Sequence, residues 1–217
     1  MRLYFNLTAN TRPVPFDYQR ALTGFLHRCL GQNDLHDGLS LYSMSWFMPG
    51  NRIDSGLNFP EGATFFISAP DGSFLKALME GIQDDPRVNW GMEVHSITMR
   101  RTPDFGSHQH FFTQSPILIK RPDDKGSRYY FPDDAESDNF MTETLQTKLR
   151  AAGLSEDVAV AFDRSYPNPR VRKITYNDID LKATQCPITV TGNPRAVQFA
   201  WEVGVGNSTG IGFGALK

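Results

Sequence analysis

The sequence predicts an α+β protein made of two units, each an antiparallel sheet with helices on one face. Residues 2–8 alternate apolar and polar side chains, which is the period of a strand. Residues 16–30 instead carry apolar side chains at the helical period. Two strand-like segments, a second helical segment and another strand follow. This β-α-β-β-α-β order is that of a ferredoxin-like (RRM-like) unit, so we expect tandem units of this type.

The first unit is expected to occupy residues 1–103. Gly31 is placed to end the first helix, and Asp71 is placed to cap the second. The other strands are expected at residues 39–47, 63–69 and 90–101. The turn-rich segment 102–107 is the expected boundary.

The second unit, residues 104–217, is less regular. A helix is expected at 138–152, where Gly153 ends it, and a short helix at 156–162. Strands are expected at residues 110–120, 127–131, 171–176, 179–183, 187–191 and 196–205. We interpret this half as a second unit of the same class with elongated final strands.

The most unusual stretch is residues 204–214, which read Gly-apolar-Gly, five residues, then Gly-apolar-Gly. Glycine allows positive φ and close backbone approach, so the stretch is expected to bring backbone N–H groups against a ligand. A glycine-rich hairpin or tail is the alternative. A dinucleotide-binding loop is excluded because the third glycine is not at the required spacing.

The formal net charge is −2 and the pI is about 6.2. This overall charge does not itself indicate a nucleic-acid partner. It does not exclude one, because a local patch of basic residues sets the electrostatic field at a binding surface. The longest basic cluster, residues 164–173, holds four cations and no acid. A solvated basic loop is the alternative interpretation of that cluster.

Several classes are disfavoured by what the sequence lacks. No run approaches the ~18 apolar residues of a membrane span, and no leader-like apolar segment opens the chain. We therefore expect a soluble cytoplasmic protein with no membrane partner. Cys29 and Cys186 lack metal-ligand spacing, and His108-x-His110 has no recognisable further ligands. No metal or cofactor is expected.

Two ferredoxin-like units that end in this glycine stretch resemble one family. It is the family of CRISPR-associated endoribonucleases that cut precursor CRISPR RNA within its repeats, in the RAMP superfamily. Weaker features occur in the same order as in the family. They are the opening strand MRLYFNL, Leu35-His36-Asp37 after the first helix, and Ser115-Pro116 at the start of the second half. The resemblance covers essentially the whole chain, and the glycine stretch is its specific part.

The resemblance implies metal-independent cleavage in which a 2′-hydroxyl attacks the adjacent phosphorus, leaving a 2′,3′-cyclic phosphate and a 5′-hydroxyl. It assigns the general base to His36. His27, on the polar face of the first helix, is the rival base. Tyr18 is a candidate general acid or RNA contact, and a core position is an equal alternative. The lysine common in the family does not follow His36 closely, so the third catalytic role stays open among Arg20, Arg52, Lys120 and Lys217.

For RNA binding, the backbone of the glycine stretch and the side chains within it are expected to contact phosphates, and basic residues are expected to attract them. The expected residues are Gly204, Gly206, Asn207, Ser208, Thr209, Gly212, Gly214, Arg20, Arg52, Arg170, Arg172 and Lys173. The partner implied is CRISPR repeat RNA, with proteins of a CRISPR effector complex as further partners and a monomer or homodimer as the assembly. A non-catalytic repeat-RNA-binding subunit of such a complex is the alternative function. A protein-interaction module of the same fold is a third.

Overall fold

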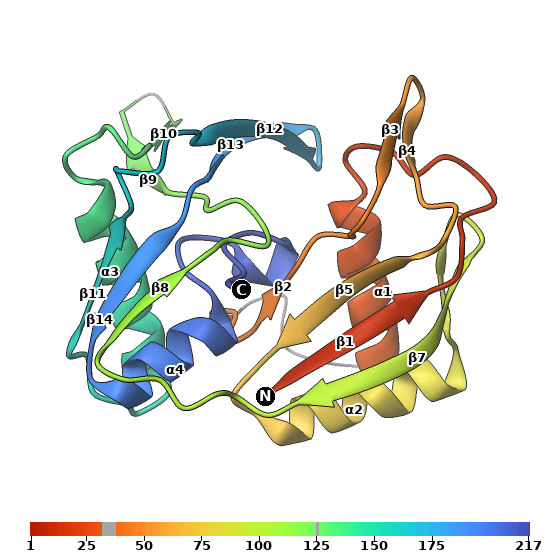
Figure 1. The fold of residues 1–217 in the computed structure, drawn as a ribbon, viewed down its shortest axis with the longest axis horizontal. Coiled ribbons are helices and arrows are strands. Elements are labelled where there is room, and N and C mark those ends of the chain that lie inside the picture. The colour runs from red at the N-terminus through yellow and green to blue at the C-terminus, as the bar shows by residue number, and fades with distance from the viewer. Residues whose placement is uncertain (32–37, 125) are drawn as a thin grey trace.

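The computed structural model describes residues 1–31, 38–124 and 126–217. In the first half, an antiparallel sheet has the strand order β2-β5-β1-β7-β6. Its strands are β1 (Arg2–Leu7), β2 (Ser43–Met44), β5 (Ala63–Ser68), β6 (Arg87–Asn89) and β7 (Met92–Arg100). Two helices, α1 (Gln19–Leu30) and α2 (Gly72–Asp84), complete the predicted β-α-β-β-α-β unit (Figure 1).

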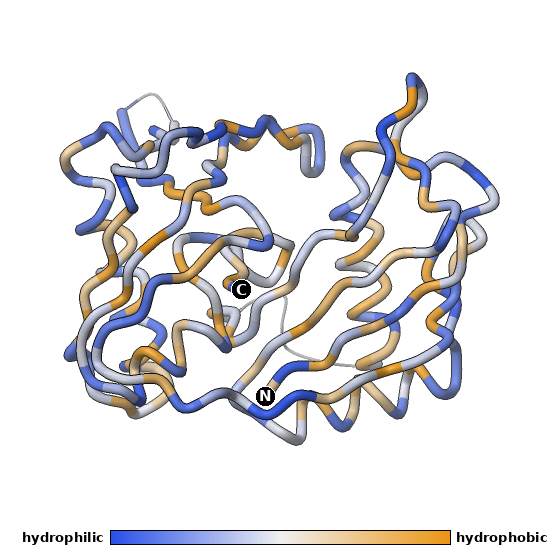
Figure 2. The backbone as a smooth tube through the Cα atoms, viewed as in Figure 1, coloured by the Kyte–Doolittle hydropathy of each residue, from blue (hydrophilic) through white to orange (hydrophobic). Residues whose placement is uncertain are grey.

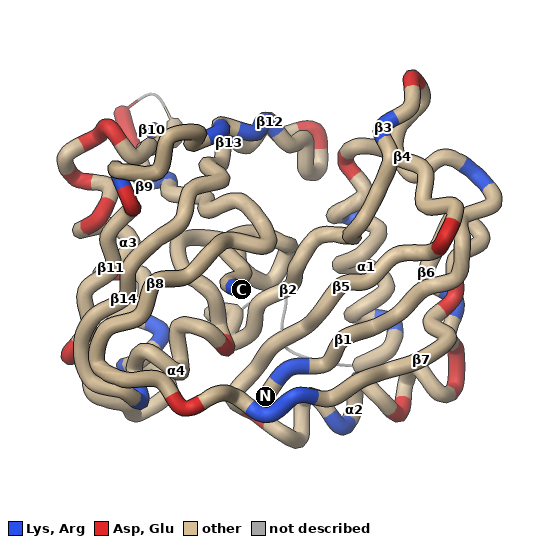
Figure 3. Tube along the Cα trace, viewed as in Figure 1, with Lys and Arg blue, Asp and Glu red and all other residues tan. Residues whose placement is uncertain are grey.

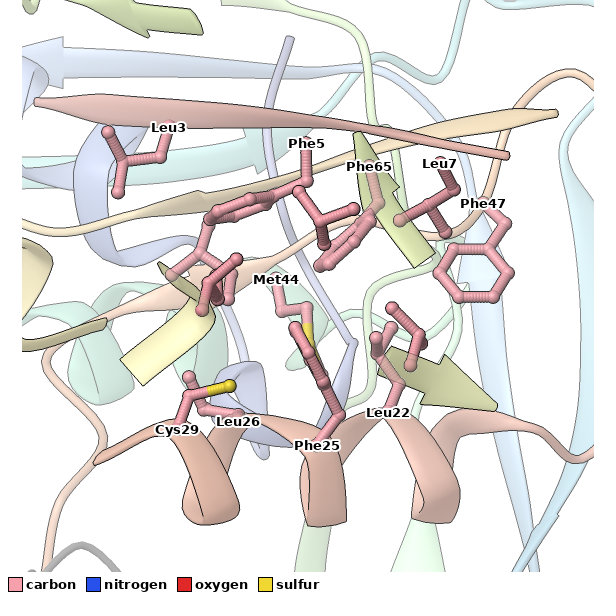
Figure 4. Close-up of a cluster of buried hydrophobic side chains, with 14 of the residues drawn as sticks. Leu3, Phe5, Leu7, Leu22, Phe25, Leu26, Cys29, Met44, Phe47 and Phe65 are labelled. Carbon is pink, nitrogen blue, oxygen red and sulfur yellow. The ribbon is translucent and has the colours of Figure 1, made fainter. Parts of the chain in front are cut away.

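The core of this half lies between the sheet and its helices. Leu3, Phe5 and Leu7 point from β1 toward α1, where Leu22 and Phe25 face them (Figure 4). Full burial of each such side chain contributes about 1.5–3 kcal/mol. The helix α2 begins as predicted, because the Asp71 side chain accepts a hydrogen bond from the Ser73 amide at 2.8 Å. Figure 2 shows hydrophobic residues running through the strands and helices of both halves.

The second half repeats the unit with a shorter last strand. Its elements are β8 (His108–Phe111), α3 (Ser137–Ala151), β11 (Val158–Phe162), β14 (Ile188–Gly192) and α4 (Pro194–Val203). The sheet order is β11-β14-β8, and the final strand is reduced to a single bridge between Thr113 and Leu216. The tandem ferredoxin-like fold is therefore confirmed. The expected elongation of the final strands is wrong.

Three hairpins extend from these two sheets. They are β3 (Asn51–Ile53) with β4 (Gly56–Asn58), β9 (Lys120–Asp123) with β10 (Gly126–Tyr129), and β12 (Arg170–Tyr176) with β13 (Ile179–Gln185). Hairpins β3–β4 and β12–β13 lie along the same edge of the molecule, one from each half (Figure 1).

Two expected strands are much shorter than predicted: only Ser43–Met44 of residues 39–47 form a strand, and residues 110–120 hold only the end of β8 and the start of β9. Two further sequence-based assignments have the wrong type. Residues 196–205 do not form a strand; most of them belong to α4, where the Asn193 side chain caps the helix and Pro194 occupies its first turn. Residues 156–162 do not form a helix, because Val158, Val160 and Phe162 are buried on one face of β11. Neither α1 nor any other helix among the described residues is long and apolar enough to span a membrane.

The two halves are joined through a buried arginine on β1. The Arg2 guanidinium donates to the carbonyl oxygens of Trp201 at 3.0 Å and Leu216 at 2.8 Å, and it stacks on the Trp201 ring. Each half keeps its own cluster of buried side chains. The boundary at residues 103 and 104 stays a prediction.

Candidate functional site

The glycine loop, residues 204–214, connects α4 to the last bridge and packs against the protein's own backbone. Gly204, Gly206 and Gly214 have φ values of 71°, 73° and 61°, which favour glycine. A Cβ on Gly204 would lie 2.6 Å from the Gly214 carbonyl oxygen, and one on Gly206 would lie 2.6 Å from the Leu118 carbonyl oxygen. Close packing within the chain therefore explains these glycines without a ligand.

Several loop N–H groups already have acceptors inside the protein. Those of Gly204, Asn207, Gly212 and Gly214 donate to the carbonyl oxygens of Ala200, Leu118, Thr209 and Pro116. The predicted contacts from these amides to phosphate stay predictions, and the geometry does not favour them. The Asn207 and Ser208 side chains are only partly buried.

A cavity of about 410 Å³ opens beside this loop, and we call it the loop cavity. Helix α1, helix α3, strand β12 and the segment 38–42 contribute its other walls. It is lined by His27, Gly38, Leu39, Ser40, Tyr42, Thr144, Lys148, Tyr176, Gly206, Asn207, Ser208, Thr209, Gly210 and Ile211. The two halves of the chain therefore form this cavity together.

Lys148 is the charged side chain in the wall from α3. Its Nζ donates to the Thr209 Oγ1 at 2.8 Å and the Val203 carbonyl oxygen at 3.1 Å. The Thr209 hydroxyl in turn donates to the Tyr42 carbonyl oxygen at 2.8 Å. Burial lowers the pKa of the Lys148 ammonium to about 7. This chain of bonds ties α3, the glycine loop and the first half together at the cavity.

Tyr42 and Tyr176 are the tyrosines on the wall of the loop cavity. Burial raises the pKa of Tyr42 to about 12, and its hydroxyl donates to the Gly210 carbonyl oxygen at 3.3 Å. Tyr176 approaches from β12. The raised pKa keeps the Tyr42 phenol neutral near pH 7, so Tyr42 adds no negative charge to the cavity.

Of the three predicted catalytic residues, the structure describes His27 and Tyr18, and it places them in different surroundings. His27 lines the loop cavity. His36 lies outside the described residues; Gly38, two positions later in the sequence, lines the cavity. Tyr18 is buried, stacks on Phe47 and accepts a hydrogen bond from the Phe47 amide at 2.9 Å. Burial raises the Tyr18 pKa, which makes that phenol a weaker acid than usual. Tyr18 is not among the residues lining the loop cavity.

A second depression, the hairpin groove, lies between the hairpins of the two halves and has a volume of about 490 Å³. Its floor is aromatic, with Phe16, Trp46 and Phe59 among the lining residues, and Phe16 is 47% exposed. Arg52 from β3 and Arg172 from β12 are part of its lining. Figure 3 shows basic residues on both of these strands.

The predicted RNA-binding cations divide into two groups. Arg52, Arg172 and Lys173 meet at the hairpin groove, although Lys173 is also ion-paired with Asp180 at 3.0 Å. Arg20 on α1 and Arg170 on β12 are exposed but line neither site. The cluster expected at 164–173 is partly neutralised, because Arg164 pairs with Asp138 at 2.6 Å.

Two elements run from the groove to the cavity. On α1, Gln19 lines the groove and His27 lines the cavity, eight residues or about 12 Å along the helix. On β12, Arg172 lines the groove and Tyr176 lines the cavity, four residues or about 13 Å along the strand. The Trp46 ring lines the groove, and its Nε1 donates to the Gly212 carbonyl oxygen at 2.7 Å. The glycine loop therefore lies between the two depressions.

Sequence reasoning missed Lys148, Tyr42 and Tyr176. A signal for Lys148 was present, because Met141, Leu145 and Lys148 share one helical face and a lysine on an apolar stripe is unusual. Residues 1–31, 38–124 and 126–217 contain no group of three or more His, Cys, Asp or Glu side chains able to hold a metal ion.

Comparisons with known proteins agree with this architecture. Residues 100–217 match the family model described as CRISPR associated protein Cas6, C-terminal. The chain is 25% identical to a CRISPR-associated endoribonuclease Cas6 of Pyrococcus furiosus over 94% of this chain and 83% of the relative. A solved Cas6-related protein from Pyrococcus furiosus has a TM-score of 0.87 at 18% identity, with 100% of this chain and 97% of that chain covered. A RAMP protein described as binding different RNA substrates has a TM-score of 0.85 at 17% identity, covering 100% and 98%. The family match spans more than half of the sequence, and the chain therefore belongs to the Cas6 family of CRISPR-associated proteins.

Proposed function

We propose that this chain is a metal-independent endoribonuclease that cleaves precursor CRISPR RNA within its repeats. Its Cas6 relative from Pyrococcus furiosus is named an endoribonuclease, which supports the reaction class. The single observation that carries the proposal for this chain is the loop cavity, where a histidine of the first half faces the glycine loop of the second. A cavity with a histidine and a buried lysine is a setting for proton transfer and charge stabilisation.

The proposed reaction uses a nucleophile that belongs to the RNA. A 2′-oxygen forms a bond to the adjacent phosphorus while the bond from phosphorus to the 5′-oxygen breaks. A base takes the 2′-hydroxyl proton, and an acid supplies a proton to the leaving oxygen. The products are a 2′,3′-cyclic phosphate and a 5′-hydroxyl, and the balance needs neither water nor a metal ion.

His36 is the proposed general base and His27 is its rival. The support for His36 is the family resemblance and its sequence position two residues before Gly38. The support for His27 is its place on the cavity wall. One of the two is expected to remove the 2′-hydroxyl proton.

The RNA is proposed to pass from the hairpin groove to the loop cavity. The aromatic floor of the groove suits base stacking, and Arg52 and Arg172 suit phosphates. Because α1 and β12 border both depressions, RNA held in the groove would be delivered to the cavity.

The test is cleavage of labelled repeat RNA in EDTA. We expect one defined cut with a cyclic phosphate end. His36→Ala is expected to keep RNA binding and slow cleavage by ~10²-fold or more. A large loss in His27→Ala with near-normal cleavage by His36→Ala would move the base to His27. His95→Ala, an exposed position on β7, is the control.

A 2′-deoxy nucleotide at the cut position tests the chemistry itself. That RNA is expected to bind and to resist cleavage. Its cleavage would overturn the 2′-hydroxyl mechanism. Tight binding of unmodified repeat RNA without any cut would instead support the RNA-binding subunit.

A further inference from the structure

Lys148 occupies an unusual position for a cation in a folded protein. Its side chain is among the residues lining the loop cavity, yet the residue is only 2% exposed. An ammonium has three N–H donors, and the described residues supply two acceptors, on Val203 and Thr209. Both acceptors are neutral oxygens. The described part of the cavity wall contains no carboxylate.

The elements packed around Lys148 bring no anion to it within the described residues. The titratable groups on the cavity wall are His27 from α1, Tyr42 from segment 38–42 and Tyr176 from β12. On α4, the Glu202 carboxylate is ion-paired with the Met1 ammonium at 2.8 Å. Asp34 and Asp37 lie outside the described residues.

A buried charge without a counter-ion is costly, and a protein relieves that cost by releasing the proton or binding an anion. The lowered pKa of Lys148 reflects the first route. The second route fits the surroundings, because Asn207, Ser208 and Tyr176 add polar side chains to the same wall. Together they resemble a phosphate site in which one cation is surrounded by neutral donors.

We propose that Lys148 binds a phosphate of the RNA in the loop cavity and supplies the cation that the sequence left unassigned. The proposal rests on the proposed function, because it takes RNA as the ligand. Lys148 holds the phosphate while Thr209 and the Val203 carbonyl fix the position of its Nζ. The glycine loop therefore contributes through its packing on Lys148 rather than through its own amides.

The proposal has a consequence for pH. A phosphate beside the ammonium favours its charged form, so RNA binding near neutral pH takes up a proton at Lys148. Affinity is then expected to fall as pH rises. Between pH 7.5 and 9.0, above the range of an ordinary histidine, we expect a loss of about tenfold.

The first experiment measures binding of repeat RNA in EDTA at several pH values. The probe carries a 2′-deoxy nucleotide at the mapped cut, or no modification if the protein does not cut. Lys148→Met keeps the apolar stem and removes the charge. We expect it to bind about tenfold more weakly at pH 7.5 and to lose most of the pH dependence.

Lys76→Met is the matched control, because Lys76 lies exposed on α2 with its charge near Glu80. It is expected to keep the wild-type pH slope. Wild-type affinity and slope in Lys148→Met would overturn the proposal. Binding with the expected slope but without cleavage would keep Lys148 as the phosphate ligand and reject the endoribonuclease.

A second measurement needs no variant and so does not depend on Lys148→Met folding. Wild-type protein labelled with ¹³C at lysine Cε is titrated by NMR with and without the RNA. The outlying lysine titration is expected to move up by about two pH units when RNA binds, which is the shift that a tenfold loss of affinity between pH 7.5 and 9.0 requires. An unchanged midpoint in the RNA complex would contradict the proposal even if cleavage is normal.

Discussion

At the scale of single residues, the environment of Lys148 opposes its charge. The ordinary lysine pKa is about 10.4, and in the folded chain burial lowers it to about 7. At pH values between these two pKa values, the unfolded chain holds more protons than the folded chain. Raising the pH across this window therefore stabilises the folded state, and the destabilisation is fully present below about pH 7.

This sign gives a stability prediction for the free protein. Relative to Lys148→Met, the wild type is expected to gain free energy of unfolding between pH 7 and 9, with a slope of at most about 1.4 kcal/mol per pH unit. Urea unfolding of both proteins at matched pH values measures the difference. A difference that stays constant with pH would show that the lysine is not desolvated as described.

Gly214 gives a second residue-scale prediction. Its φ is 61°, and a Cβ there would collide with the Val205 carbonyl oxygen. Gly214→Ala is expected to destabilise the fold by about 2–3 kcal/mol through backbone strain and displacement of the loop. Gly106→Ala is the control, because nothing lies within 4 Å of its added Cβ, and denaturant unfolding compares the two. An equally small effect in both variants would contradict the packing explanation of the loop glycines.

At the scale of elements, periodicity predicted the segments in which one face is clearly buried. Helix α1 and strand β1 follow their apolar patterns. Helix α4 was missed because seven of its ten residues are buried, so its pattern is nearly continuous and does not separate a helix from a strand. The deciding signal was local: Asn193-Pro194 is a helix start, although it also reads as a turn.

The cap of α4 can be tested alone. The Asn193 side chain accepts a hydrogen bond from the Arg195 amide at 2.9 Å. Asn193→Ala is expected to destabilise the protein by about 1 kcal/mol, which lowers the melting temperature by roughly 2–4 °C for a chain of this size. Asn193→Asp keeps a capping oxygen and is expected to melt near the wild type. Equal losses in both variants would argue against the cap.

At the scale of the whole molecule, the candidate sites are properties of the assembled halves. The glycine pattern was visible in the sequence, and so was His27 on a polar helical face. The sequence did not show that the glycine loop and His27 border one cavity, because the loop cavity depends on packing between residues more than a hundred positions apart. Lys148 and Tyr176 complete that wall only after α3 and β12 are placed against the loop.

The hairpin groove leads to the last prediction, which concerns salt. Arg52 comes from the first half and Arg172 from the second, and both line the groove, where Arg52 also lies over the Phe16 ring. If each neutralises one RNA phosphate, each alanine variant should lower the slope of log affinity against log salt by about 0.7. The double variant should lose about twice that, because the cations lie on separate elements and act independently.

Binding of the 2′-deoxy repeat RNA at several salt concentrations measures these slopes. Lys173→Ala is expected to change the slope less, because Asp180 already neutralises part of its charge at 3.0 Å. Lys76→Met, on the exposed face of α2, should leave the slope unchanged. If the double variant Arg52→Ala, Arg172→Ala keeps the wild-type slope of log affinity against log salt, the RNA lies outside the groove. That result would not decide whether Lys148 binds a phosphate, because Lys148 lies in the loop cavity. The pH dependence of RNA binding tests that contact separately.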